Sequence, residues 1–293
     1  MGNKQSDLPP PSPEFAKPWR RLDWDSNEIL HEVREFKPST EVLRILLYGP
    51  TGAGKSSFIN SVQRVLLGRH AMSALENCTS TGKSFTKQIN IHKLKKDRGK
   101  YYPLEIIDIM GLQREGGIQT DDIRSLLNGH ILDGYILNPE VPISDTDSKY
   151  KNNPVVCDEV DCLVCVLPAD TVSMMDVEVF DKIKEVRAYA SLQGIPQVIV
   201  MTKVDKVCEL VNEDLKKINY SKKIKEKVNE CNVKVGIPIN AIYPVKNYAE
   251  EITQDSNTDM FILKVLRDIL HFSNDYVEQK LEQKDKKVDS SQP

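Results

Sequence analysis

The sequence has no long hydrophobic run, few aromatic residues and no strong excess of one charge. No apolar stretch approaches the roughly 20 residues that a membrane-spanning helix requires, so we expect no such helix. The 40 lysine and arginine residues are balanced by 43 aspartate and glutamate residues, which gives a formal net charge of −3. This balance provides no global positive field for a nucleic-acid backbone. We therefore expect no specific nucleic-acid partner, and any binding of polyanions must be local.

Cysteine is also scarce, with six residues scattered among 293 and no secretory signal before them. This excludes a disulfide framework and favours a reducing compartment, which we expect to be the cytoplasm. Cys162 and Cys165 have the spacing of a redox or zinc half-site, but they lie in an apolar run. Because no second pair or nearby histidine completes a zinc site, we interpret both as small buried hydrophobic residues.

The N-terminal region lacks the patterns of a signal peptide and of regular structure. Its first six residues fit the Met-Gly-x-x-x-Ser/Thr pattern for N-myristoylation at Gly2, and a single acyl chain gives at most weak membrane association. A proline cluster follows, which predicts an extended arm. Apolar residues then recur at helical spacing from Ser26 and stop at Pro38. Residues 1–38 are therefore expected to form an arm and a short docking helix.

The strongest motif is the glycine-rich segment that begins at Gly49, between an apolar strand and an amphipathic helix. Its glycines allow successive backbone N–H groups to surround a phosphate, while Lys55 neutralises phosphate oxygens and Ser56 ligates Mg²⁺. The pattern Gly-x-x-x-x-Gly-Lys-Ser in this context predicts the phosphate-binding loop of a P-loop NTPase. The residues expected to contact the nucleotide here are Gly49, Thr51, Gly52, Ala53, Gly54, Lys55, Ser56 and Ser57.

A second motif, Asp-x-x-Gly, starts at Asp108 directly after a predicted strand and ends at Gly111. From that position a carboxylate can reach Mg²⁺ through water, and the Gly111 N–H can meet a γ-phosphate. Asp108 therefore joins Ser56 as an expected metal residue.

A third motif begins at Thr202 at the end of another apolar strand, and it resembles the Asn/Thr-Lys-x-Asp motif with which GTPases recognise their base. Asp205 can accept hydrogen bonds from guanine N1–H and the 2-amino group, a donor pair that adenine lacks. The stem of Lys203 can lie along the base plane. Together the motifs favour GTP and Mg²⁺ as ligands.

Three positions complete the pattern or depart from it. A threonine that bridges Mg²⁺ and the γ-phosphate is expected in the loop before the second strand, which offers Thr79, Thr81 and Thr86; Thr81 is the preferred candidate. The Ser-Ala-Lys motif of GTPases is absent, and Asn247 is the candidate base contact in its place. Leu112 stands where many small GTPases carry a water-orienting glutamine, and Gln113 follows it. Because leucine cannot orient water, hydrolysis is expected to be slow unless Gln113 or a partner's residue does so.

The remaining pattern predicts one α/β domain over residues 39–276 and a disordered charged tail over 277–293. Apolar runs alternate with amphipathic segments, which predicts a mostly parallel sheet with helices on both faces. Residues 112–155 exceed what a compact crossover needs and are interpreted as an insertion at the nucleotide-binding edge. The helix after the glycine loop is expected to stop at Gly68. Strands are expected at Val42–Tyr48, Phe85–His92, Leu104–Asp108, Asp161–Pro168, Gln197–Thr202 and Ile237–Tyr243, and further helices near Asp121–Leu132, Met174–Gln193, Glu209–Lys217 and Asp259–His271.

With these motifs the chain resembles the interferon-induced protein 44 family, including its 44-like member. The most family-specific part is Glu-Gly-Gly followed by Asp-Asp-Ile and Leu-Asn-Gly-His. The resemblance implies a cytoplasmic, interferon-inducible protein of the innate antiviral response that binds GTP through its phosphate loop. Longer members carry a separate N-terminal domain where this chain has the proline-rich arm. The resemblance is carried by Lys17–Arg20, Arg44–Pro50, Gly52–Val62, Asp108, Gly111, Leu112, Glu115–Gly117, Asp121–Ile123 and Leu127–His130.

Three functions remain open. The first is a switch or scaffold in which bound GTP or GDP controls a surface of the 112–155 insertion for an unidentified protein partner. The second is an active hydrolase in which Mg-GTP turnover drives assembly. The third is an ATP-binding protein in which the base motif is a coincidence. Single-turnover hydrolysis separates the first two, and nucleotide competition separates the third.

Overall fold

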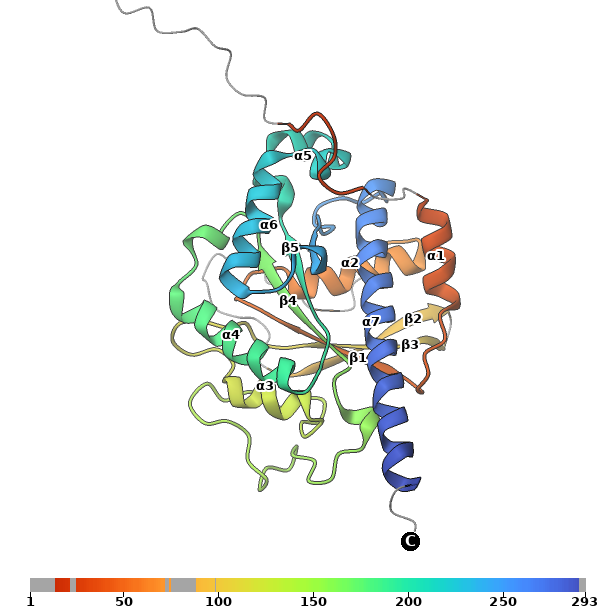
Figure 1. The fold of residues 1–293 in the computed structure, drawn as a ribbon, viewed down its shortest axis with the longest axis vertical. Helices are drawn as coiled ribbons and strands as arrows, with labels where there is room; N and C mark the ends of the chain where they lie inside the picture. Colours follow the sequence, from red (N-terminus) through yellow and green to blue (C-terminus); the bar gives the residue numbers. More distant parts are fainter. Residues whose placement is uncertain (1–13, 22–24, 72–73, 75–87, 98, 290–293) are drawn as a thin grey trace, which may run out of the picture.

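The computed structural model describes residues 14–21, 25–71, 74, 88–97 and 99–289. Its core is a six-stranded sheet in the order β2-β3-β1-β4-β5-β6 (Figure 1). Only β2 is antiparallel, and it lies at one edge beside β3. The predicted mostly parallel α/β sheet is therefore confirmed. The strands are β1 (Leu43–Tyr48), β2 (Asn90–Asp97), β3 (Lys100–Asp108), β4 (Cys162–Pro168), β5 (Gln197–Thr202) and β6 (Ile242–Pro244).

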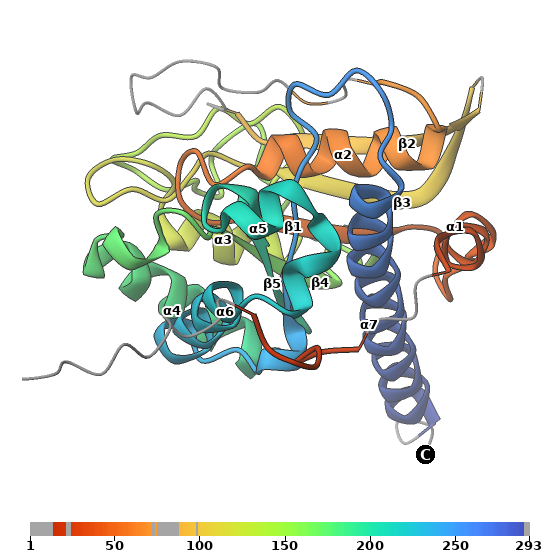
Figure 2. The same ribbon diagram turned by 90° about the horizontal axis from the view of Figure 1, so that it is seen from above.

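Helices cover both faces of this sheet, with α1, α2 and α7 on one side and α3, α4 and α6 on the other (Figures 1 and 2). β1 and β4 are buried along their whole length, as expected of central strands covered on both faces. Cys162 and Cys165 of β4 are both fully buried, which fits their interpretation as core residues. The helices are α1 (Ser26–Glu35), α2 (Lys55–Leu67), α3 (Thr120–Leu127), α4 (Val177–Leu192), α5 (Glu209–Glu213), α6 (Lys222–Val235) and α7 (Ser256–Asp289).

Helix α6 was not predicted, because its lysine-rich first half hides the amphipathic pattern. Four buried positions, Ile224, Val228, Cys231 and Val235, recur at helical spacing and face the core. Several other boundaries also differ: β2 extends to Asp97, α3 ends at Leu127, and β6 is only three residues long. The part of the expected second strand at 85–87 lies outside the described residues.

The disordered tail that we predicted from residue 277 is wrong for its first part, because α7 continues to Asp289. Val277 is buried against the core. Lys280 Nζ lies 2.5 Å from Glu159 Oε2, in the loop before β4. A charged, polar composition is compatible with an exposed helix as well as with disorder, and these two tertiary contacts favour the helix.

The 112–155 segment packs onto the domain through a row of apolar side chains. Ile123 and Leu126 of α3 are buried, and so are Ile131, Leu137 and Ile143 of the loops that follow. The segment is thus tied to the core at several points along its length. Elsewhere on it, Ile136 is 70% exposed and Val141 is 59% exposed.

The end of the N-terminal arm lies near β6, the edge strand at the other side of the sheet from β2. Trp19 donates from its backbone N–H to Asn219 O (2.9 Å) and from its indole to Ile218 O (3.2 Å). The Arg20 guanidinium donates to Ile242 O of β6 (2.8 Å). The Arg20 bond thus ties the arm to the short edge strand β6. No helix in the described part of the chain is long and apolar enough to cross a membrane.

Candidate functional site

The phosphate loop connects β1 to α2 and can be built only with glycine at its tightest points. Gly49 has φ +142°, and a Cβ there would lie 2.2 Å from Val166 O of β4. Gly54 has φ +92°, and a Cβ there would lie 3.0 Å from Asn247 Nδ2. The loop is therefore enclosed on two sides by backbone and side chains that leave no room for a larger residue.

Lys55 is the first residue of α2 and is 7% exposed. Its ammonium group donates to Gly49 O (3.4 Å) and Pro50 O (3.3 Å), so that the loop curls round it. Burial lowers the pKa of Lys55, and the nearby charge of Asp108 opposes that shift. The buried cation is thus placed to neutralise an anion held in the loop.

Ser56 and Asp108, the two predicted metal residues in the described part of the chain, lie together. The Ser56 hydroxyl donates to Asp108 Oδ2 at 2.6 Å. Asp108 is 2% exposed, and its other oxygen, Oδ1, is buried without a hydrogen-bond partner. Burial raises the pKa of Asp108, whereas Lys55 and the Ser56 hydrogen bond lower it.

This donor set fits Mg²⁺. The ion prefers oxygen ligands and usually binds through one or two protein groups together with phosphate oxygens and water. A hydroxyl beside a carboxylate that has one unsatisfied oxygen supplies such a pair. In the described ranges there is no group of three or more His, Cys, Asp or Glu side chains that could hold a metal by itself.

The loop after β3 folds directly onto the phosphate loop. Leu112 N donates to Gly49 O (2.9 Å), Thr51 N donates to Leu112 O (3.3 Å), and Gln113 Nε2 donates to Thr51 Oγ1 (2.8 Å). A Cβ on Gly111 would lie 2.5 Å from the Thr51 backbone, so only glycine allows this approach. Leu112 is 1% exposed and belongs to the core, whereas Gln113 points at the phosphate loop.

Helix α4 holds the same loop from the other side. Lys182 Nζ donates to Gln113 O (2.7 Å) and Arg114 O (3.3 Å). Glu185, one turn further along α4, accepts from Arg124 of α3 at 2.6 Å. Sequence reasoning missed Lys182, because a lysine that donates to distant backbone carbonyls leaves no local pattern.

The base motif follows β5 and is joined to the phosphate loop. The Thr202 hydroxyl donates to Ala53 O at 2.6 Å. Lys203 has φ +58°, the only positive φ among non-glycine residues in the described part, and its Nζ lies 4.0 Å from Asp170 Oδ2. Asp205, partly exposed, follows in a short 3₁₀ turn. A left-handed lysine is strained, and such residues cluster at functional sites.

Asn247 completes this side of the site. Its Nδ2 donates to Gly54 O at 3.0 Å, and its buried Oδ1 has no hydrogen-bond partner. Lys246 beside it forms an ion pair with Glu251 at 2.8 Å. Burial alone would lower the pKa of Lys246. The charges of Glu251 and of the more distant Asp205 outweigh this effect, so the pKa is raised. Lys246 thus brings a positive charge near Asp205.

The loop that carries Asn247 is anchored on α2 by a residue that the sequence did not reveal. Arg64 is 2% exposed and lies 3.9 Å from the ring centroid of Tyr248. Its guanidinium donates to Glu251 O (2.6 Å) and Thr253 O (2.5 Å). The helix that begins at the phosphate loop therefore also fixes the loop on the base side.

The structure thus brings the predicted residues of three motifs and Asn247 to one edge of the sheet, at the carboxyl ends of β1, β3 and β5. Ligands bind at this edge in open α/β sheets. The phosphate loop is open at Gly52, because a Cβ placed there would have no atom within 4 Å. Thr81 and Gly2 lie outside the described residues, so their predicted roles stay predictions.

A comparison with solved structures finds distant likenesses. Toc33 from Arabidopsis thaliana in complex with GDP and Mg²⁺ aligns with 13% identity and a TM-score of 0.46, over 84% of this chain and 89% of that one. A putative nucleolar GTP-binding protein 1 from Plasmodium falciparum aligns with 14% identity and a TM-score of 0.36, over 87% and 99%. Both scores are below 0.5, so the fold class stands on the sheet topology itself.

No protein-family model matches the chain. Human interferon-induced protein 44 is 34% identical over 254 residues, the mouse protein is 32% identical over 257, and human interferon-induced protein 44-like is 32% identical over 258. These alignments cover 85–86% of this chain but only 57–60% of the relatives, so the chain spans less than two thirds of their length. The resemblance inferred from the motifs is confirmed: over 85–86% of its length, the chain is similar to the interferon-induced protein 44 and 44-like proteins.

Proposed function

We propose that the chain binds GTP and GDP with Mg²⁺ and acts as an interferon-induced, nucleotide-dependent switch or scaffold in antiviral defence. The observation that carries this proposal is the 2.6 Å contact between Ser56 and Asp108 beside the buried Lys55, at the mouth of a glycine loop. The names of the relatives support the interferon-induced part.

Different residues of the site are expected to bind the phosphates, the metal and the base. Backbone N–H groups of the phosphate loop and the Lys55 ammonium bind the phosphates. Ser56 and Asp108 hold the metal, which would neutralise charge on the phosphate oxygens. Asp205 accepts from the base, and the Lys203 stem lies along it. The loop at Gly111 senses the γ-phosphate, because it already contacts the phosphate loop at Thr51.

Hydrolysis is expected to be slow. Leu112 is buried in the core and cannot orient water, and the Gln113 amide is engaged with the Thr51 hydroxyl. A nucleotide-dependent release of that hydrogen bond would free Gln113, which keeps the active hydrolase as the second candidate. Single-turnover hydrolysis of GTP separates the two: a rate well below the roughly 10 s⁻¹ of a median enzyme supports the switch.

Titration with fluorescent GTP, GDP and ATP analogues, with and without Mg²⁺, tests the proposal. We expect GTP and GDP to bind more tightly than ATP. We expect Lys55→Ala to weaken GTP binding at least tenfold, because charge-assisted hydrogen bonds of about 1.5–3 kcal/mol each are lost. Lys184→Ala, an exposed lysine on α4, serves as the control. Circular dichroism shows whether each variant is folded, and equal GTP affinity of wild type and folded Lys55→Ala would reject the assignment.

The cellular part of the proposal concerns a protein partner, the location and a lipid. Ile136 and Val141 on the 112–155 segment offer exposed apolar contacts to a protein partner. We place the protein in the cytoplasm, with at most weak membrane association through myristate on Gly2. Intact-mass measurement of protein from eukaryotic cells tests the lipid, and a terminus without the myristoyl mass excludes it.

A further inference from the structure

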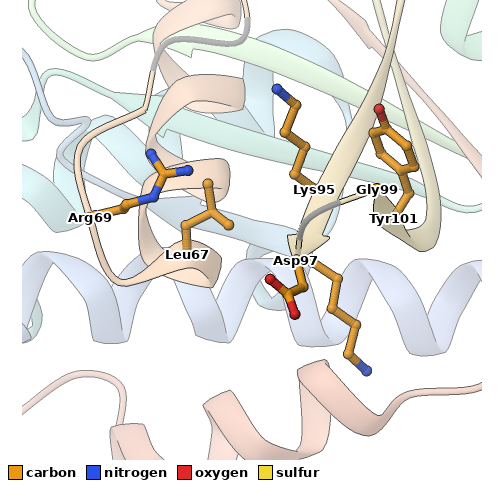
Figure 3. A pocket seen from close by; sticks show the side chains of 7 residues that line it. Leu67, Arg69, Lys95, Asp97, Gly99 and Tyr101 are labelled. Atoms are coloured by element: carbon orange, nitrogen blue, oxygen red, sulfur yellow. The ribbon is translucent and has the colours of Figure 1, made fainter.

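A cavity of about 590 Å³ lies at the end of α2 remote from the phosphate loop (Figure 3). Because α2 has 13 residues and rises about 1.5 Å per residue, the helix separates the two places by roughly 20 Å. The cavity is formed where the end of α2 meets the β2–β3 hairpin. Its lining residues are Leu67, Arg69, Lys95, Lys96, Asp97, Gly99 and Tyr101.

Two of its cations are not neutralised by a carboxylate. Among the described residues, Lys95 and Arg69 make no ion pair, whereas the neighbouring Lys93 pairs with Glu105 at 3.5 Å. In Figure 3 the amine of Lys95, the guanidinium of Arg69 and the hydroxyl of Tyr101 point to the same side, whereas the Asp97 carboxylate points to the opposite side. The cavity therefore presents positive charge with a hydroxyl donor.

The position of Lys95 is set by a buried side chain. Gln63 of α2 is 0% exposed; its Oε1 accepts from Lys95 N (2.7 Å) and its Nε2 donates to Lys95 O (3.0 Å). The strand pairing shifts register on both sides of Lys95, an irregularity of the kind that re-aims a side chain. Lysines on an edge strand commonly serve only to prevent aggregation. Gln63 fixes the backbone at Lys95, and thereby the point from which the lysine side chain leaves the strand.

We propose that this cavity binds a small organic anion with several phosphate groups, of the inositol-phosphate class, either free or as a lipid headgroup. Its volume is in the range of ligand pockets and too large for a lone phosphate ion. The Arg69 guanidinium can hold one phosphate through two parallel hydrogen bonds, and Lys95 supplies a point charge for a second. The hydroxyl of Tyr101 donates to the same ligand. Since the chain carries a net charge of −3, this attraction is local to the cavity.

Calorimetric titration of the full chain with inositol 1,4,5-trisphosphate tests the proposal. We expect saturable binding with one ligand per chain, weakened at least tenfold by Lys95→Ala and by Arg69→Ala. Lys93→Ala is the matched control on the same strand and leaves the affinity unchanged. Asp97→Asn removes the acidic group at the rim and strengthens binding. All four side chains are on the surface, so the variants keep the fold.

Co-sedimentation with vesicles containing phosphatidylinositol 4,5-bisphosphate identifies the source of the ligand. Vesicle binding that is lost in Lys95→Ala assigns a lipid headgroup, and binding of the free compound alone assigns a soluble ligand. Absence of saturable binding in both arms, or equal binding by wild type and Lys95→Ala, overturns the proposal and leaves the lysines as protection of the edge strand. Lys55→Ala retains this binding, so the result is independent of the nucleotide site.

Discussion

At the scale of single residues, the side chains of Thr202 and Asn247 hold the end of the phosphate loop. The Thr202 hydroxyl donates to Ala53 O (2.6 Å), and the Asn247 amide donates to the next carbonyl, Gly54 O (3.0 Å). A hydroxyl has one donor hydrogen, whereas an amide has two. Thr202 therefore cannot serve both carbonyls, and Asn247 supplies the second bond from a different loop.

Removal of that bond should weaken nucleotide binding. We expect Asn247→Ala to raise the Kd of GTP and of GDP about two- to tenfold, because a neutral hydrogen bond contributes about 0.5–1.5 kcal/mol and Gly54 O keeps its bond from Phe58 N (2.9 Å). Adding Thr202→Asn to this variant should recover affinity, since one asparagine amide can donate to both carbonyls. Fluorescence titration of the single and double variants measures this. Equal affinity of wild type and Asn247→Ala contradicts the role.

Asp205 gives a second prediction at this scale. In Asp205→Asn we expect preference to shift from guanine toward xanthine nucleotides. Xanthine has an acceptor where guanine has its 2-amino donor, and asparagine can donate to that acceptor. Competition between GTP and XTP measures the shift. An unchanged affinity ratio would show that Asp205 does not contact the base, and the ATP-binding alternative would then gain support.

At the scale of structural elements, the loop from Gly111 to Gly117 gives the family-specific Glu-Gly-Gly segment a physical role. Gly117 has φ +80° and pairs with Leu112, and a Cβ there would lie 2.7 Å from Gly111 O. A side chain at Gly117 would push Gly111 away from Thr51. This loop therefore keeps Gln113 against the phosphate loop only while residue 117 is glycine.

We expect Gly117→Ala to lower the free energy of unfolding by about 1–3 kcal/mol and to weaken GTP binding. Gly116→Ala is the matched control, because Gly116 also has a positive φ, +71°, but its Cβ would meet only the end of Gln113 at 3.9 Å. That variant carries the backbone strain without the collision, so the loss of GTP affinity should be smaller. Urea denaturation and GTP titration measure both effects. Indistinguishable variants would show that the collision has no consequence.

At the scale of the whole molecule, the buried carboxyl group of Asp161 makes the stability of the fold depend on pH. It is 3% exposed and accepts from Arg44 N of β1 at 2.8 Å. Burial raises its pKa from 3.8 to about 7, against the hydrogen bond from Arg44 and the charge of Lys280 on α7. Since the folded state holds this proton more tightly than the unfolded state, stability from this group falls as pH rises from about 4 to 7.

We expect Asp161→Asn to remove that slope. The asparagine oxygen can still accept from Arg44 N, but it carries no buried charge, so the variant should gain stability relative to wild type as pH rises from 5 to 8. Urea denaturation across this range measures the difference. Glu230 and Glu251 do not interfere, because their pKa values are lowered to about 2 and their contributions are lost only below pH 4.5. Parallel stability curves for the two proteins would contradict the assignment.

Part of the candidate site and most of the helices could be predicted from the sequence. Motifs at the ends of apolar strands located most of the site, because the carboxyl ends of parallel strands share one edge. Lys182, Arg64 and Gln63 were missed because each bonds to a backbone far away in sequence, between 32 and 189 residues distant. Helix α6 and the end of α7 were missed because lysine and glutamine dilute the apolar pattern that reveals a helix.

The sequence by itself determined the glycine loop, the order of the strands and of most helices along the chain, and the likeness to one family, because each depends on residues that are neighbours in the chain. The tertiary structure alone decided that Ser56 meets Asp108, that Gln113 lies on Thr51 and that Asn247 supports Gly54. It also decided that Lys95 faces a cavity beside Arg69. Such contacts depend on how strands are ordered in the sheet and on which helix faces pack together, and local patterns do not encode either.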